Sequence, residues 1–158
     1  MSHTVPTAID GDVDGLEAGH PLAALNAFYR AFNTRDMHAM EQNWWRNDAA
    51  SMSNPLGGIA RGWPAIREVY ARIFGGKAQV RVAFHDYTLH EVGLHEAGDM
   101  FYAVGRERGT LVSGDTSLTL AIRTTRLFRR IDGAWKQVHH HGSFEDPDLF
   151  AAYRKAVQ

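Results

Sequence analysis

The chain has 158 residues, 44% of them hydrophobic, which suits one domain with a single core. Lysine and arginine total 17 against 18 aspartates and glutamates, so no broad basic surface is available for nucleic acid or anionic lipid. Cysteine is absent, which excludes disulfides, thiolate catalysis and cysteine zinc sites. No stretch approaches the roughly 20 apolar residues that span a bilayer. We therefore expect a cytoplasmic protein that binds neither nucleic acid nor membranes.

Residues 1–19 are rich in aspartate and glycine and contain no lysine or arginine, so they are predicted to form a flexible acidic leader. Within them, "DGDVDG" at 10–15 begins like a calcium-binding loop, which requires a glutamate at its twelfth position. That position is Pro21. We therefore expect no metal there, and no cofactor is indicated elsewhere.

The region after the leader is helical. Apolar residues recur at three- and four-residue steps over 22–32, 37–44 and 66–73, which predicts three helices. Pro21 suits the first turn of the first helix, and Asp36 can cap the second. These helices are the first half of the fold.

The second half is predicted to be β-sheet. Segments of roughly 77–95, 99–112, 115–131 and 134–144 are rich in Val, Thr, Phe, Tyr and Leu and are separated by turn residues. A shorter hairpin is expected at 49–62, between the second and third helices. Helices followed by antiparallel strands indicate an α+β domain, a cone-shaped roll of strongly curved antiparallel sheet wrapped around three N-terminal helices. The hollow of such a cone is the expected ligand site.

Two stretches carry a family resemblance. "ALNAFYRAFNTRDMHAMEQNWWRNDAASMSNPLGGIARGWPAIREVYARIFGG" resembles the helical half of the nuclear transport factor 2-like superfamily, which includes SnoaL-like cyclases, ketosteroid isomerases and limonene epoxide hydrolases. "TTRLFRRIDGAWKQVHHHGS" is similar to the closing strands of the calcium/calmodulin-dependent kinase association domain and its stand-alone bacterial relatives.

The resemblance covers residues of about 22 to 144. It implies a cystatin-like cone that pairs through its sheet into a homodimer, with a small-molecule ligand inside. We accordingly divide the chain into the leader at 1–19, a SnoaL-like cone domain at 20–145 and a C-terminal helical tail at 146–158.

The residues of ketosteroid isomerases are not reproduced. The family's aspartate base stands in a D-P-x-G turn, and the matching turn here is Asn54-Pro55-Leu56-Gly57, whose amide is no base. Phe28 stands where the family has a tyrosine, although Tyr29 is adjacent. The family's protonated acid would fall near Arg126. Enolisation by that mechanism is therefore not expected.

Histidine is the remaining candidate for catalysis. On a strand at 134–144, His140 would face one side, and His139 and His141 the other. Matching to the association domain places Val138, His140 and Gly142 inward, and a bulge would reverse this. Three adjacent histidines cannot share one site, so no metal is predicted.

Three further residues are candidate ligand contacts. Arg126 matches a pocket arginine of the association domain and needs an anionic partner, either an internal carboxylate or a bound carboxylate ligand. The internal candidates are Glu68, Asp86 and Asp115. Trp45 could form an aromatic wall of the hollow. Asn54 either caps its turn or turns its amide toward a ligand.

Three functions remain open. The preferred one is a dimeric SnoaL-like domain that binds a small molecule, such as a carboxylate or carbonyl compound, in a partly polar hollow. The second is an isomerase, cyclase or hydrolase in which His140 is the general acid or base. The third is an assembly domain in which dimers build larger rings.

Overall fold

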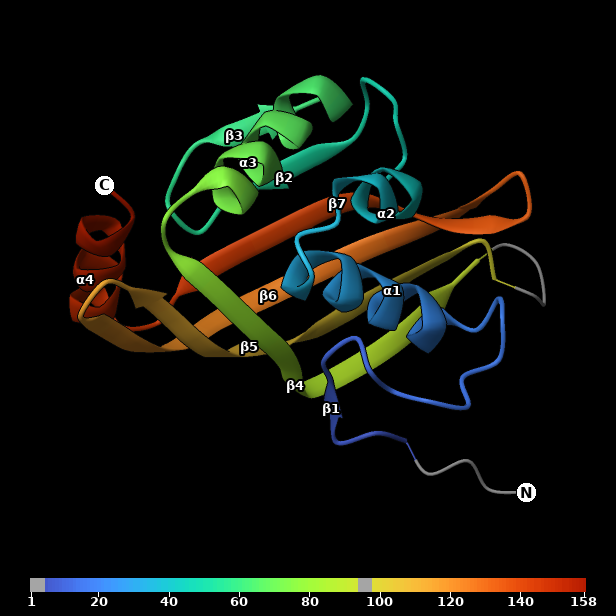
Figure 1. The fold of residues 1–158 in the computed structure, drawn as a ribbon. Helices are drawn as coiled ribbons and strands as arrows, with labels where there is room; N and C mark the ends of the chain where they lie inside the picture. The colour runs from blue at the N-terminus through green and yellow to red at the C-terminus, as the bar shows by residue number, and fades with distance from the viewer. Residues whose placement is uncertain (1–4, 94–97) are drawn as a thin grey trace.

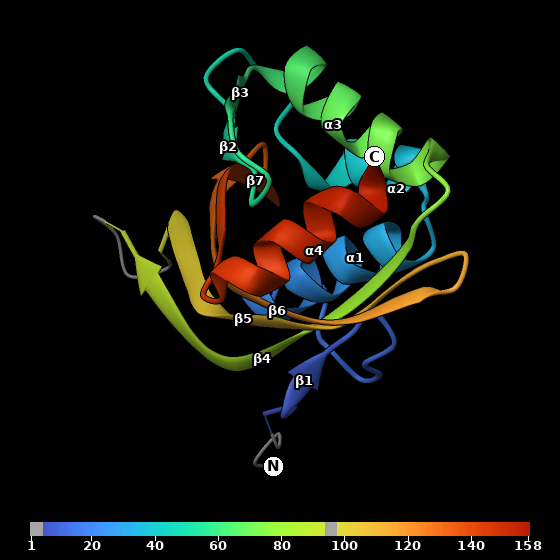
Figure 2. The same ribbon diagram turned by 90° about the vertical axis from the view of Figure 1, so that its left-hand side faces the viewer.

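The computed structural model describes residues 5–93 and 98–158, and in this part of the chain four helices lie on the concave side of one curved sheet (Figures 1 and 2). The α+β cone expected from the sequence is confirmed. The end view in Figure 2 shows the sheet curling around the helices without closing into a barrel.

The sheet has the order β1-β4-β5-β6-β7-β2-β3. Its bounds are β1 (Ala8–Ile9), β2 (Ser51–Ser53), β3 (Ile59–Arg61), β4 (Gln79–Val92), β5 (Met100–Ser113), β6 (Thr116–Ile131) and β7 (Ala134–Phe144). The expectation of a wholly antiparallel sheet needs a correction, because β2 pairs with β7 in parallel. The chain leaves the second helix alongside β7 and in its direction, as the parallel bridge between Trp44 and Gln137 shows.

The helices are α1 (Pro21–Asn33), α2 (Met37–Asn43), α3 (Trp63–Gly75) and α4 (Pro147–Val157). Asp36 caps α2 as expected, because its side chain accepts a hydrogen bond from the Ala39 amide. Asp146 caps α4 in the same way, accepting from the amides of Asp148 and Leu149. Within the described ranges, no helix is long and apolar enough to cross a membrane.

Aromatic side chains join α1 to α3 and to the sheet. Phe28 packs against Tyr70 of α3 with ring centroids 6.3 Å apart, and Tyr29 stacks on Phe84 of β4 at 5.7 Å. Both α1 residues are almost completely buried. Their adjacent positions direct them to different neighbours, so one helix turn contacts both layers of the cone.

The described part of the predicted leader, residues 5–19, contacts the domain at several points. Ile9 is fully buried where β1 pairs with β4. The Arg30 side chain of α1 donates to the Gly11 carbonyl at 2.7 Å, and a Cβ at Gly11 would fall 2.4 Å from the Arg30 nitrogen. The Trp135 indole donates to the Gly19 carbonyl at 2.8 Å. Composition does not reveal these contacts, because main-chain carbonyls make most of them.

A buried ion pair joins the middle of the sheet to α1. Arg126 of β6 donates to Glu107 of β5 with 2.5 Å between Nη2 and Oε1. The Tyr29 hydroxyl donates to the same Glu107 oxygen at 2.9 Å and accepts from Arg126 Nε at 3.2 Å. Arg126 Nη1 donates to Gln137 Oε1 at 2.8 Å, and Gln137 in turn donates to Asn43 of α2 at 3.2 Å. The network thus connects two helices and three strands.

We predict that Arg126→Met destabilises the domain by about 3–5 kcal/mol, because it leaves the Glu107 carboxylate buried without its cation. The double variant Arg126→Met/Glu107→Leu should lose less than the sum of the two single changes, because neither charge is then left alone. Urea unfolding followed by circular dichroism measures both quantities.

Arg108→Met is the matched control. Arg108 also pairs with a carboxylate, Asp86, at 2.6 Å. This pair lies on the exposed face of β5, the strand that carries Glu107. Its loss should cost far less than that of Arg126, since water screens the pair. Equal losses in the two single variants would contradict the structural role given to the buried pair.

Candidate functional site

The cone encloses a hollow of about 650 Å³ between the helices and the sheet. Phe28, Val69, Tyr70 and Ile73 line it from the helical side, and Asn54 and Pro55 from the turn between β2 and β3. Arg126, Glu107 and His140 line it from the sheet, while Tyr153 and Val157 of α4 line its outer end. Most of this wall is apolar, and polar side chains reach it from the sheet, from the β2–β3 turn and from helices α3 and α4.

His140 is the buried histidine of the hollow. It is only 6% exposed, and neither of its ring nitrogens has a hydrogen-bond partner among the described residues. It pairs across the sheet with Arg126 and Met52, which also face inward. Burial lowers the pKa of His140 well below its usual value, and the nearby Arg126 charge lowers it further. The imidazole is therefore neutral near pH 7.

A β-bulge at Val138 changes which side chains of β7 face inward. The pairing register with β6 shifts between Leu127 and Phe128, so Gln137 pairs with Phe128 and His139 with Leu127. Gln137 and His140 therefore both face inward, and Val138 is the extra residue of a bulge. The expected inward orientation of His140 is thus found, whereas Gln137 takes the inward position predicted for Val138. His139 lies on the opposite face, where its Nδ1 is 2.7 Å from the Ser51 hydroxyl.

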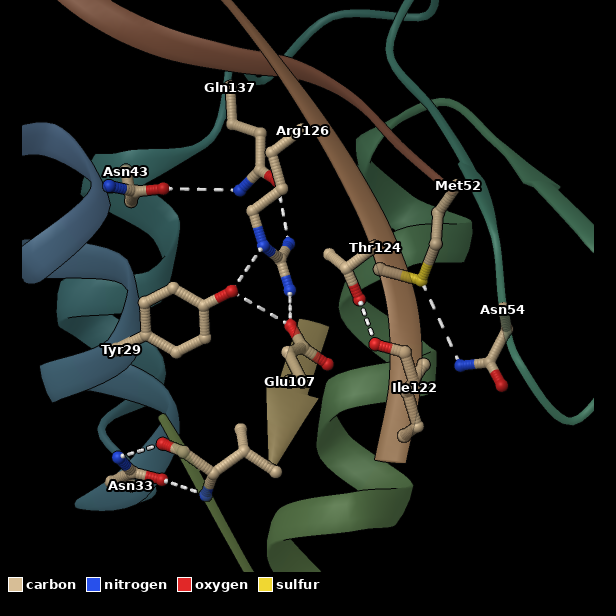
Figure 3. Close-up of polar contacts among 11 residues, drawn as sticks. Tyr29, Asn33, Asn43, Met52, Asn54, Glu107, Ile122, Thr124, Arg126 and Gln137 are labelled. Carbon is tan, nitrogen blue, oxygen red and sulfur yellow. Dashed lines mark hydrogen bonds and ion pairs between the residues drawn. The ribbon is translucent and has the colours of Figure 1, made fainter. Parts of the chain in front are cut away.

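Asn54 caps its turn and also lines the hollow. Its Oδ1 accepts a hydrogen bond from the Leu56 amide at 2.8 Å, which closes the turn. Its Nδ2 lies 4.0 Å from the Met52 sulfur, a weak contact that leaves most of its donor capacity unused (Figure 3). The side chain lines the hollow.

Gly142, which was expected to face inward, is covered by the turn between β2 and β3. A Cβ at Gly142 would lie 2.6 Å from Pro55 Cγ and 3.2 Å from His140 Nε2. The proline ring therefore occupies the space over this glycine. This close approach holds the turn against β7 beside His140.

Arg126 lines the hollow, but its partner is internal. The partner is Glu107, not Glu68, Asp86 or Asp115 as the sequence suggested (Figure 3). Burial would lower the pKa of Arg126, but Tyr29 and Glu107 outweigh it and raise this pKa, so the guanidinium stays charged. Each of its three nitrogens already donates to a protein oxygen.

Glu107 lies in the charged stretch "RERG", which is typical of an exposed strand. The alternation of side chains along the strand does predict that Glu107 faces inward. Phe101, Ala103 and Leu111 stand at even spacings from it and face the core. Tyr70 and Tyr153 were also missed as polar groups of the hollow, since their helical spacing predicts only core packing. Burial is the main cause that raises the pKa of each to about 12.

Trp45 does not line the hollow. Helix α2 ends at Asn43, and Trp44 has extended backbone angles. The side chain of Trp44 is buried in the core, so the next side chain in this extended segment, Trp45, points to the opposite side. The main-chain amide of Trp45 donates to the Gln137 carbonyl at 2.9 Å. The prediction assumed that the helix continued through both tryptophans.

The hollow can form hydrogen bonds but shows no metal-binding group. In the described part of the chain, no three histidine, aspartate or glutamate side chains are close enough to hold an ion. The inner polar groups with unused capacity include the neutral imidazole of His140, the Asn54 amide nitrogen and the Tyr70 hydroxyl, which has no partner among the described residues. Arg72 and Lys77 also line the hollow but are exposed to solvent. The inner groups suit an uncharged ligand with polar substituents.

Comparisons with solved structures support the fold. A protein from Thiobacillus denitrificans ATCC 25259, described as a calcium/calmodulin-dependent protein kinase type II association domain, is 27% identical, with a TM-score of 0.61 over 84% of this chain and 100% of that one. A ketosteroid isomerase-like protein from Erwinia carotovora atroseptica is 22% identical, with a TM-score of 0.63 over 79% and 93%. An uncharacterized protein with a cystatin-like fold from Caulobacter vibrioides is 20% identical, with a TM-score of 0.63 over 84% and 90%.

The search of curated proteins finds no match to this chain. The SnoaL-like domain family matches residues 22–147, which include α1 to α3, the strands β2 to β7 and the sheet side of the hollow. This match covers most of the chain, and the cone-shaped fold agrees with it. The chain belongs to the SnoaL-like domain family.

Proposed function

We propose that the protein binds a small, uncharged organic molecule in the hollow of the cone. The observation that carries this proposal is His140, a buried imidazole whose two nitrogens have no partner among the described residues. Leaving such polar groups unpaired costs free energy, and a ligand that pairs with them recovers it. The size of the hollow and its mostly apolar wall also suit a small organic ligand.

The ligand is expected to carry a carbonyl group. The Asn54 amide nitrogen and the N–H of neutral His140 can both donate to a carbonyl oxygen. A carboxylate bound to Arg126, considered from the sequence, is disfavoured because the nitrogens of Arg126 already donate to Tyr29, Gln137 and Glu107.

An enzyme is the second candidate function. Because His140 is neutral and has a free lone pair, it could act as a general base toward a ligand in the hollow. It makes no hydrogen bond with Asn54 or Arg126, so no other side chain orients it as a catalytic partner would. For this reason we prefer binding over catalysis.

We further propose that the protein forms a homodimer through the convex face of the sheet. The four helices lie on the concave side, and none covers this face (Figure 2). Val104 of β5 is 41% exposed on it, and Ile59 of β3 is 57% exposed. Arg106 and Arg108, which follow Val104 on the same face of β5, pair with Asp86 and Glu145, so much of the charge beside Val104 is compensated within the chain. Such a face suits a second copy of the chain.

A ligand screen tests the binding proposal. We expect small cyclic ketones to raise the melting temperature of the wild-type protein and to bind more tightly than the matching hydrocarbons, as measured by thermal shift and by calorimetry. Ile73→Trp should abolish this binding, because Ile73 lines the hollow and the larger ring fills it. Mass spectrometry of the recovered ligand would show conversion if the enzyme reading were correct.

Ala71→Trp is the control for this experiment. Ala71 stands on the exposed side of the same helix, α3. Its replacement should leave ligand binding unchanged. If no ketone, alcohol or carboxylate in the screen binds, or if both tryptophan variants bind as the wild type does, the hollow is not a ligand site.

The titration of His140 predicts a pH dependence of stability. In the unfolded chain His140 takes up a proton below about pH 6.5, whereas the folded protein resists this, so the free energy of unfolding falls as the pH falls through that value. In His140→Phe this acid-side slope should be smaller, by at most about 1.4 kcal/mol per pH unit. Urea unfolding between pH 7.5 and pH 5 measures the slope.

Val138→Phe, on the same strand, removes no titratable group and should keep the wild-type slope. The slope, and not the stability at one pH, is compared, because the phenyl ring also changes packing. Identical slopes for the wild type and His140→Phe would contradict a neutral His140 in the folded state.

Light scattering tests the dimer. We expect twice the mass of the chain for the wild type and a monomer for Val104→Lys, because a charge would then lie in the middle of the proposed interface. Val112→Lys, at a similarly exposed position near the end of the same strand, should remain dimeric. A monomeric wild type would contradict the proposal, and a larger ring would favour the assembly domain.

A further inference from the structure

The second carboxylate oxygen of Glu107 is free to accept a hydrogen bond. Oε1 accepts from both Arg126 and Tyr29, at 2.5 and 2.9 Å. Oε2 accepts from no donor in the part of the chain that the structure describes, and in Figure 3 it points away from both of these partners. Glu107 is only 6% exposed and lines the hollow.

Among the described residues, no neighbouring group donates a hydrogen bond to Glu107 Oε2. Tyr70 and Tyr153 line the same hollow, yet neither hydroxyl donates to Glu107. Ile122, which pairs with Glu107 across the sheet, and Phe144 supply apolar walls. Because Glu107 lines the hollow, a molecule there that brings an O–H group can pair with this oxygen.

Charge restricts what that molecule can be. The Glu107 and Arg126 charges cancel each other, and each nitrogen of Arg126 already donates within the protein. An anionic ligand at Oε2 would therefore meet Glu107 as a like charge, and the other cations that line the hollow, Arg72 and Lys77, are exposed to solvent. An ether or a hydrocarbon would leave Oε2 unpaired. A neutral hydroxyl pairs with it without adding charge.

We propose that Glu107 Oε2 is a ligand-binding group that accepts a hydrogen bond from the hydroxyl of an uncharged alcohol, phenol or enol in the hollow. This inference rests on the proposed binding function and narrows its ligand class. The hydroxyl at Glu107 complements the carbonyl expected at Asn54 and His140, so the preferred ligand is a hydroxylated carbonyl compound. Glu107 then has two roles, because one oxygen holds Arg126 and the other selects the ligand.

Matched ligands test the inference on the wild-type protein. Naphthol, methoxynaphthalene and naphthoate share one ring system, and cyclohexanol, methoxycyclohexane and cyclohexanecarboxylate share another. We expect each alcohol to bind at least about tenfold more tightly than its ether, the size expected for a hydrogen bond to a buried charged group, and the carboxylates to bind most weakly. Calorimetry or ligand-observed NMR gives the dissociation constants at neutral pH.

The outcomes separate this inference from the binding function beneath it. If alcohol and ether bind equally, or the carboxylate binds best, the role of Glu107 is overturned while the hollow remains a binding site. If no member of either series binds and the ketone screen is also negative, the binding function itself fails, and this inference fails with it.

Glu107→Gln gives an independent readout. Its amide oxygen can still accept from Arg126 and Tyr29, which turns the NH₂ group toward the hollow and replaces an acceptor with a donor. The preference for alcohol over ether should disappear or reverse. Tyr153→Phe, which removes a different hydroxyl from the hollow, should keep the preference. Circular dichroism checks that Glu107→Gln folds, and if it does not, the wild-type ligand series alone decides.

Discussion

The ion pair between Arg126 and Glu107 is the constraint on which the rest of the interior depends. The two residues stand on adjacent strands, and Ile122, the cross-strand partner of Glu107, lies four positions before Arg126. One inward-facing row separates them, and it consists of Gly105, Thr124 and Gly142. Two opposite charges can remain in this interior only because they pair and because Tyr29 and Gln137 satisfy the remaining groups.

This pairing decides the chemistry of the hollow. A free arginine would make the cone an anion site, as the sequence allowed. With Arg126 neutralised, the groups of the hollow left to form hydrogen bonds with the proposed ligand are the imidazole of His140, the amide of Asn54 and the second oxygen of Glu107. The charge of Arg126 also acts on His140, since it helps to lower the histidine pKa and so keeps the imidazole neutral. The structural and the ligand-facing groups are thus one connected set.

Local patterns predicted the elements well and their side-chain directions less well. The helices begin and end near their predicted limits because proline, aspartate and glycine act on the backbone within a few residues. The bulge at Val138 could not be located from the sequence, because it depends on how β7 pairs with β6 and not on the composition of β7. Glu107 was missed for a different reason: strand alternation places it inward, but its charged neighbours Arg106 and Arg108 suggest an exposed strand. Tertiary pairing, which a single sequence does not display, decided both cases.

The two ends of the hollow have different origins. The groups that can bind a polar ligand, Asn54, Glu107 and His140, lie within the segment that matches the SnoaL-like family. Helix α4 begins where that match ends, and it adds Tyr153 and Val157 to the outer end. Phe144 fixes this helix, with ring centroids 5.5 Å from Phe150 and 5.2 Å from Tyr153. The segment that matches the family therefore supplies the groups that carry the proposed binding, while α4 adds to the lining from outside it.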